Sequence, residues 1–206
     1  MLTIHGRINS INVQKVVLAC EELKLPYVRH DAGGAFGIVQ TAEYKAMNPN
    51  SLVPVMVDGD LVLWESNAII RYLAAKHGEG TLWPSDPATR ALSDRWMDWQ
   101  TTNLSVKMHA AFWGLIRTAP DKQDATAIAA SAAATEASMA ILDAALAGKA
   151  FIAADHVTMG DIALLAAAFR WLNLPLARQS RPHVEAWIAR MMARPGYGKA
   201  LKLPVT

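Results

Sequence analysis

Residues 48–67 read NPNSLVPVMVDGDLVLWESN, and this stretch decides the fold. Residues 54–57 have the apolar, β-branched character of a strand that begins at a proline. The Asp-Gly-Asp sequence at residues 58–60 is a hairpin turn signal, so residues 61–63 are expected to return as a second strand. Residues 65–67, Glu-Ser-Asn, then open a helix. The stretch therefore predicts two antiparallel strands followed by a helix.

A strand–helix–strand unit is expected before this hairpin. Residues 2–5 predict a strand, and apolar residues recur at helical spacing over residues 13–23. Residues 27–30 suit a second strand, which the helical crossover makes parallel to the first. The glycines within residues 31–40 indicate a surface loop. A short helix is expected at residues 41–47.

Strand signals vanish after residues 78–87, whose glycines and prolines mark a linker. A long helix is expected next, with one apolar stripe that an asparagine interrupts. The members of this stripe are Leu92, Trp96, Trp99, Asn103, Val106, Ala110 and Trp113. Residues 122–147 are alanine-rich and helical by propensity. Residues 158–161, Thr-Met-Gly-Asp, resemble a capping box with Asp in place of Glu or Gln, and they open a further helix.

With 206 residues, the chain has room for two small domains. The order of the elements predicts the fold class α/β plus all-α. We expect an α/β domain at residues 1–77, a linker at 78–87 and a larger all-helical domain at 88–206. Hydrophobic residues make up 52% of the chain and charged residues 18%, which is typical of a packed globular protein rather than a disordered one.

Composition also argues against several classes of partner. The net charge of +2 comes without a dense block of Lys and Arg, so no nucleic-acid partner is expected. The single cysteine excludes an internal disulfide framework and a thiolate zinc cluster, and no metal motif is present. The N-terminus lacks the pattern of a signal peptide, and the most apolar stretch, residues 160–169, is too short to span a bilayer. We therefore expect a soluble cytoplasmic protein with no membrane partner.

Four segments, taken in this order, resemble the cytosolic glutathione S-transferases. They are residues 10–16 (SINVQKV), 48–54 (NPNSLVP), 63–69 (LWESNAI) and 158–163 (TMGDIA). The first, with its Ser-x-Asn-x-x-Lys-Val pattern, is similar to that of bacterial members. The resemblance covers nearly all of the chain. It implies a thioredoxin-like N-terminal domain followed by an all-helical C-terminal domain, a homodimer, and glutathione as cosubstrate without a metal.

If glutathione is the cosubstrate, as the resemblance implies, the site must favour the thiolate form of glutathione over the thiol. A free thiol has a pKa near about 8.5, and lowering it by about two units takes roughly 2.7 kcal/mol. One charge-assisted hydrogen bond supplies roughly 1.5–3 kcal/mol, and a helix N-terminus adds about 0.3–1 kcal/mol. Ser10 matches the family's catalytic serine, and Asn12 could also donate a hydrogen bond. The alternative is that Ser10 or Asn12 only caps the helix.

The resemblance also implies a glutathione-binding set. It implies a cis peptide bond before Pro54, with the backbone N–H and C=O of Val53 holding the cysteinyl part of glutathione. It implies that Ser66 binds the γ-glutamyl carboxylate of glutathione and that Glu65 binds the ammonium group. The N-terminus of a helix is by itself a site that can bind a carboxylate. The alternative is that these two residues only cap the helix. Gln40 is expected near the glycyl carboxylate.

The electrophile site is expected between the domains, along the long helix, with Asn103, His109, Trp113 and Arg117 as candidates. Trp113 could instead be a core residue. Asn103 and Arg117 are informative because polar groups beside an apolar stripe need a partner. His109 has no carboxylate or cysteine partner in the sequence, so neither catalysis nor metal binding is expected of it.

Other residues are expected to have structural roles. Thr158 and Asp161 match a structural motif of the family that satisfies free N–H groups within the helical domain. Cys20 lies on the apolar face of the first helix, where a buried, inert thiol is expected. Ser51 departs from the resemblance, because many relatives have glycine there. The change affects the loop before Pro54 but leaves the backbone pairing intact.

Three functions compete. The leading one is glutathione transfer in detoxification, by thiolate attack on a small hydrophobic electrophile. The second is glutathione-dependent disulfide reduction, because Ser10-x-Asn12 resembles the Thr-x-Asn arrangement of bacterial transferase-like disulfide reductases, which need no protein cysteine. The third is a non-catalytic binding module. The intact Ser10, Val53-Pro54 and Glu65-Ser66 sites argue against that module, which would have no need of all three.

Overall fold

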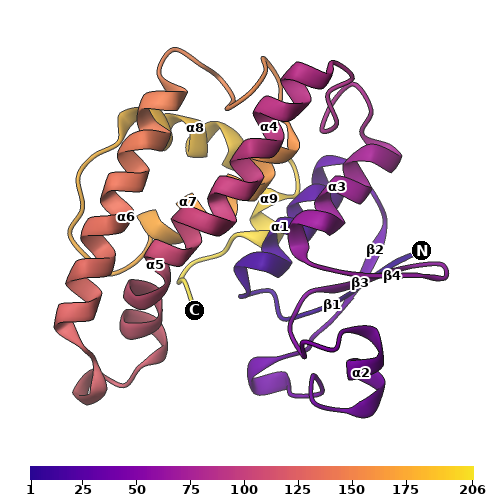
Figure 1. Cartoon of the computed structure of the whole chain (residues 1–206), viewed down its shortest axis with the longest axis horizontal. Helices are drawn as coiled ribbons and strands as arrows, with labels where there is room; N and C mark the ends of the chain where they lie inside the picture. The colour runs from indigo at the N-terminus through magenta and orange to yellow at the C-terminus, as the bar shows by residue number, and fades with distance from the viewer.

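The computed structural model describes residues 1–206 and places a small sheet on one side of the molecule and the longer helices on the other (Figure 1). The sheet order is β2-β1-β3-β4, with β1 parallel to β2 and antiparallel to β3, and β3 antiparallel to β4. The expected strand–helix–strand unit and hairpin are both present. The elements of this part are β1 (Leu2–His5), α1 (Ile11–Glu22), β2 (Tyr27–His30), α2 (Ala42–Met47), β3 (Val55–Asp58), β4 (Leu61–Trp64) and α3 (Ser66–His77).

Side chains on the two faces of the sheet pack into different clusters. Helices α1 and α3 contribute to the main hydrophobic core, which also includes Met56 of β3. The neighbouring Val55 points to the opposite face, as strand geometry requires, and packs with Tyr44 of α2 and Ala32. The sheet is therefore covered on both faces, so the loops at the ends of its strands are the parts that remain accessible to a ligand.

The second part of the chain is helical. Its helices are α4 (Pro87–Trp99), α5 (Ser105–Phe112), α6 (Ala125–Leu146), α7 (Met159–Leu172), α8 (Pro182–Met192) and α9 (Tyr197–Ala200). Two π-helical segments interrupt the expected long helix: Gln100–Leu104 joins α4 to α5, and Trp113–Arg117 follows α5. Every residue of α7 except Leu172 is buried, so α7 forms the centre of this part.

The apolar stripe expected along the long helix is wrong, because the buried face of the helices is shifted from it by about one residue. Leu92, Val106 and Trp113 are 41%, 65% and 53% exposed. The buried positions along α4, the first π-helical segment and α5 are Ser93, Trp96, Met97, Gln100, Leu104, Met108, Ala111 and Phe112. A periodicity built from apolar residues alone misses this face because it includes Ser93 and Gln100, which are buried with hydrogen-bond partners.

The expected capping box at the start of α7 is present. The Asp161 carboxylate accepts hydrogen bonds from the backbone N–H of Thr158 (3.0 Å) and of Ile152 (2.9 Å), and from the Trp187 indole N–H (3.0 Å). The Thr158 hydroxyl also donates to it, and Asp161 is fully buried. Burial raises the pKa of this carboxyl, which the surrounding donors oppose. The box holds the loop before α7 and helix α8 against the first turn of α7.

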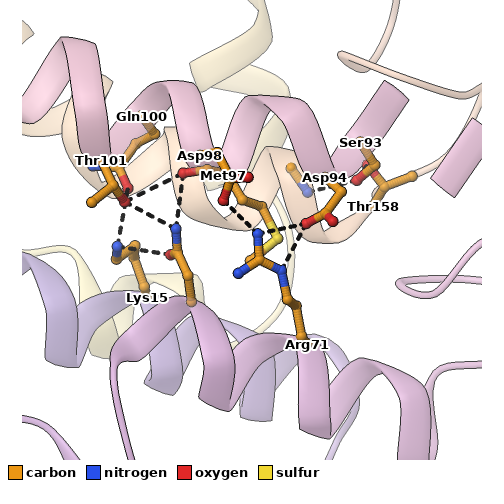
Figure 2. A network of polar contacts seen from close by, with 11 residues as sticks. Lys15, Arg71, Ser93, Asp94, Met97, Asp98, Gln100, Thr101 and Thr158 are labelled. Atoms are coloured by element: carbon orange, nitrogen blue, oxygen red, sulfur yellow. Dashed lines mark hydrogen bonds and ion pairs between the residues drawn. The ribbon is translucent and has the colours of Figure 1, made fainter. Parts of the chain in front are cut away.

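A polar network joins α1 and α3 to α4 and the turn that follows it (Figure 2). The Lys15 ammonium donates to the Asn67 side-chain oxygen (2.9 Å) and to the Gln100 side-chain oxygen (3.0 Å). Arg71 of α3 pairs with Asp94 (2.7 Å) and Asp98 (2.6 Å) of α4. These contacts fix the end of α3 that carries Ser66 relative to the helices opposite.

Helix α6 is long and apolar enough, by length and composition, to cross a membrane. Alanine supplies much of this apolar character. A single helix of this length and composition is weak evidence for membrane insertion, so α6 is not a clear membrane span.

Candidate functional site

One end of the sheet brings three loops together. His5 at the end of β1 pairs with Val55 at the start of β3, and Val55 pairs with Trp64 at the end of β4. The loop after β1, the loop before β3 and the turn after β4 therefore lie at the same end of the sheet. These loops carry the three groups of residues for which the sequence predicts glutathione contacts.

Ser10 is the N-cap residue of α1 by backbone geometry (φ −84°, ψ 123°), and its side chain makes no capping hydrogen bond. Its carbonyl accepts the helical bond from the N–H of Gln14 at 2.9 Å. The hydroxyl is thus not used as a cap, and it can donate to a ligand at the positive end of the helix. Asn12, two residues on, is exposed.

The Val53–Pro54 peptide bond is cis, as expected. Neither the N–H nor the C=O of Val53 has a hydrogen-bond partner in the backbone. The preceding loop is held in place, because Leu52 O accepts from the Tyr44 hydroxyl and from the Asn48 amide, both at 2.9 Å. Ser51 has a φ of 56°, a left-handed conformation that glycine adopts more easily. A fixed loop with an unpaired donor and acceptor can pair with an extended peptide.

Helix α3 begins without a side-chain cap. Glu65 occupies the N-cap position with a φ of 70°, which is rare for a residue other than glycine, and its side chain accepts no capping bond. Ser66, the first helical residue, is 5% exposed. The first N–H groups of α3 are unpaired donors at the positive end of the helix, so this end can bind a carboxylate.

A cavity of about 240 Å³ lies between the start of α1 and the α4–α5 helix pair. Its walls are Ile11, Asn12, Gln100, Thr101, Ser105, Met108, His109, Phe112, Trp113 and Arg170. The rings of His109 and Trp113 stack with their centres 5.7 Å apart. Both π-helical segments contribute to the walls, and such segments are frequent at functional sites. Three of the predicted residues, Asn12, His109 and Trp113, therefore share one cavity.

Several other predicted residues do not line this cavity. Asn103 is half-buried, and its amide donates to the Thr102 hydroxyl at 3.0 Å. Gln40 is exposed before α2, and neither residue lines the cavity. Arg117 is exposed at the end of the second π-helical segment, with its guanidinium carbon 5.7 Å from the Phe112 ring centre. Trp113 is not a core residue, because it is 53% exposed.

Sequence reasoning missed Arg170 and assigned no role to Lys15. Arg170 lines the cavity although it follows the apolar run of α7, and a charge at the end of such a run was the available signal. Burial lowers the pKa of the Lys15 ammonium to about 7, while the Glu65 carboxylate raises it and Arg71 lowers it. Burial also raises the pKa of the Cys20 thiol to about 12, so this thiol stays protonated.

Two family models match this chain. The model of the glutathione S-transferase N-terminal domain matches residues 9–76, and the model of the C-terminal domain matches residues 104–195. The chain belongs to the glutathione S-transferase family. This membership confirms the expected thioredoxin-like and helical fold class, the transferase activity and glutathione as cosubstrate. The bacterial Ser-x-Asn-x-x-Lys-Val subtype stays a prediction.

Known relatives cover the full chain. Glutathione S-transferase GstB of Escherichia coli (strain K12) is 44% identical, with all of both chains covered. Glutathione S-transferase 3 of Zea mays is 31% identical, with 98% of this chain and 96% of the relative covered. The crystal structure of the theta class glutathione S-transferase from Xanthomonas axonopodis pv. citri, with glutathione bound, superposes with a TM-score of 0.96 at 43% identity and covers 100% of this chain and 99% of that one.

No group of three or more His, Cys, Asp or Glu side chains is placed to hold a metal ion.

Proposed function

We propose that the protein conjugates the glutathione thiolate to small hydrophobic electrophiles. The observation that carries this proposal is the meeting of three unpaired groups at one end of the sheet: the Ser10 hydroxyl, the Val53 backbone and the uncapped start of α3. An apolar cavity lies directly beside the start of α1. A thiolate at Ser10 would face an electrophile in that cavity.

In the proposed binding mode, the Val53 N–H and C=O pair with the cysteinyl residue of glutathione. The γ-glutamyl carboxylate binds the Ser66 hydroxyl and the first N–H groups of α3, and the Glu65 carboxylate takes the γ-glutamyl ammonium group. Gln40 is kept as the candidate for the glycyl carboxylate. This arrangement leaves the sulfur near the N-terminus of α1, where a negative charge is favoured.

The Ser10 hydroxyl would stabilise the thiolate by donating a hydrogen bond to the sulfur, and it would keep its own proton. Asn12 is the second candidate donor. The sulfur then forms a bond to the electrophilic carbon. In a substitution the leaving group departs with the electron pair of its bond to that carbon. In an addition the π electrons of the double bond move to its other end, which takes a proton from solvent. Met108, Phe112 and Trp113 form an apolar wall for the electrophile, and His109 lies in the same cavity. Arg117 and Asn103 are kept as further polar candidates, although neither lines the cavity.

Glutathione-dependent disulfide reduction is the second candidate. Asn12 is exposed on the cavity wall, and the single cysteine is buried and protonated, so a thiol for this reaction would have to come from glutathione. Turnover of hydroxyethyl disulfide without turnover of 1-chloro-2,4-dinitrobenzene would favour this candidate over conjugation.

We also propose a cytoplasmic homodimer in which residues 1–77 bind glutathione, residues 88–206 bind the electrophile, and residues 78–87 link the two domains. The support for the dimer is the outer strand β4, where Leu61, Val62 and Trp64 are 38%, 40% and 37% exposed. An exposed apolar sheet edge is a surface that proteins normally cover.

Glutathione binding measured by calorimetry tests the proposed site. Wild type is expected to bind, Ser66→Ala is expected to lose affinity with its circular dichroism unchanged, and Ser10→Ala is expected to bind but react slowly. An unchanged affinity in Ser66→Ala would contradict the assignment. If wild type does not bind at millimolar glutathione, the fold serves as a binding module, and protein partners become the next question.

A further inference from the structure

Arg170 in the cavity wall and Arg117 beside the wall residue Phe112 have no acidic partner, and Arg7 adds a third positive charge that acts on both. Arg7 follows β1, Arg117 ends the second π-helical segment, and Arg170 belongs to α7. The ion pairs of the molecule all involve other residues. Three positive charges from three distant parts of the sequence are therefore left without compensation beside the proposed thiolate.

Arg170 is the most buried of the three. It is 8% exposed, it lines the cavity, and its guanidinium carbon lies 4.0 Å from the centre of the Phe112 ring. Its one hydrogen bond runs from Nη2 to the backbone oxygen of Asn9, at 3.1 Å. The remaining N–H groups have no acceptor in the chain. These N–H groups are not fully enclosed by the chain, so they are available to an anionic ligand in the cavity.

The other two arginines act on the same region. The Arg117 guanidinium carbon lies 5.7 Å from the same Phe112 ring, and the side chain of Arg7 lies against the Gly33–Gly34 turn. Burial, followed by the charges of Arg117 and Arg7, lowers the pKa of Arg170 to about 10. Burial and the charge of Arg117 also lower the pKa of Arg7. A guanidinium stays protonated at neutral pH, so the cleft is strongly positive there.

We propose that Arg170 and Arg117 form a subsite for a carboxylate carried by the electrophile. The substrate class is then a small electrophile with an apolar or aromatic body and one carboxylate, whose body packs on Phe112. Arginine suits this role because its planar fork matches a carboxylate with two parallel hydrogen bonds. This inference rests on the proposed function, in which the two carboxylates of glutathione are bound elsewhere.

A matched pair of substrates tests the subsite: 4-chloro-3-nitrobenzoate and its methyl ester. In both, the glutathione sulfur forms a bond to the carbon that bears chlorine, and chloride leaves with the electron pair of the C–Cl bond. The thiol proton goes to solvent, and nothing is oxidised or reduced. The two substrates differ at the carboxyl group, so their kcat/KM ratio reports the subsite.

The variants are Arg117→Gln and Arg170→Gln, with Arg190→Gln as a control that removes an exposed arginine of α8. The ester is intrinsically the more reactive substrate because it withdraws electrons more strongly than the carboxylate. Wild type is therefore expected to show a higher benzoate-to-ester ratio of kcat/KM than the cleft variants. Each cleft variant is expected to lower kcat/KM for the benzoate about tenfold or more, the effect of one charge-assisted hydrogen bond, and to leave the ester within about threefold. Arg190→Gln is expected to leave both unchanged. Arg117→Gln keeps the test valid if Arg170→Gln fails to fold.

Equal losses for benzoate and ester in the cleft variants would overturn the subsite, and so would a loss that appears only as a higher KM for glutathione, because the arginines would then bind glutathione itself. If wild type binds glutathione but converts neither substrate, calorimetry with the two glutathione conjugates decides, and equal affinities overturn the proposal. Absence of glutathione binding would instead remove the proposed function, and with it the subsite.

Discussion

At the residue scale, the Ser10 hydroxyl is the group on which thiolate stabilisation depends in the proposed mechanism. It lies at the start of α1 and makes no capping hydrogen bond. Ser10→Ala is expected to raise the pKa of bound glutathione by about one to two units, the value of one charge-assisted hydrogen bond. The ultraviolet absorbance of the thiolate, followed against pH, measures this shift.

Asn12→Ala is the matched comparison, because Asn12 is the second candidate donor on the same helix end. A larger rise in the pKa of bound glutathione in Asn12→Ala than in Ser10→Ala would make the Asn12 amide the main donor to the thiolate. Ser10→Thr retains a hydroxyl and is expected to restore most of the thiolate.

Lys15 makes stability depend on pH. Its pKa falls from 10.5 to about 7 on burial, so between these values the unfolded chain binds a proton that the folded chain does not. The free energy of unfolding contributed by Lys15 therefore rises by about 1.4 kcal/mol per pH unit as pH increases through this window. Lys15→Met is expected to remove this rise.

Urea unfolding of wild type and Lys15→Met at pH 7 and pH 9 measures the effect, because other groups titrate equally in both. If the difference in unfolding free energy between the two proteins is the same at both pH values, Lys15 is not titrating in this window. The network with Asn67 and Gln100 would then hold a fully charged ammonium.

At the scale of the element, α7 depends on its first turn. Asp161→Ala would leave the backbone N–H groups of Ile152 and Thr158 and the indole of Trp187 without an acceptor. We expect a loss of about 3 kcal/mol or more in unfolding free energy, since removing one partner of a buried polar network leaves the others unsatisfied. Urea denaturation at neutral pH measures it.

Asp86→Ala is the control. Asp86 caps α4 through the N–H of Thr89 at 2.8 Å, and it is exposed. An exposed cap is worth about 1 kcal/mol. Similar losses in the two variants would mean that burial adds nothing to the capping box of α7.

The elements also show what the sequence could predict. The hairpin and the strand–helix–strand unit were predictable because their signals are local: a turn at 58–60 and alternating or helical spacing on either side. The face of α4 and α5 was missed because Ser93 and Gln100 are buried polar residues, which a hydrophobic pattern excludes. The π-helical segments carry no comparable sequence signal.

The candidate site divides in the same way. Ser10, Val53, Pro54, Glu65 and Ser66 were found through motifs that resemble a family. Arg7 was not found, because nothing local distinguishes it from a surface arginine, and Arg170 was not found although it follows an apolar run. Their charges act on Arg117 only in the folded chain, which brings together the loop after β1, the end of the second π-helical segment and α7.

At the scale of the whole molecule, the exposed edge of β4 predicts the oligomeric state. Leu61→Lys places a charge on the apolar surface of β4 and is expected to convert the dimer into a monomer. Sedimentation velocity measures the change. Leu203→Lys is the control, because Leu203 is 63% exposed and lies near the C-terminus. A monomeric wild type would contradict the proposed dimer at once.

The burial of α7 also bears on how such an enzyme can change over evolution. Arg170 belongs to a helix that is the packed centre of the helical part, whereas Arg117 is exposed and Arg7 lies in a loop. A change at Arg170 disturbs the core, while a change at the other two leaves it intact. Substitutions that change substrate preference are therefore expected at Arg7 and Arg117. Arg170 is expected to vary least among natural sequences.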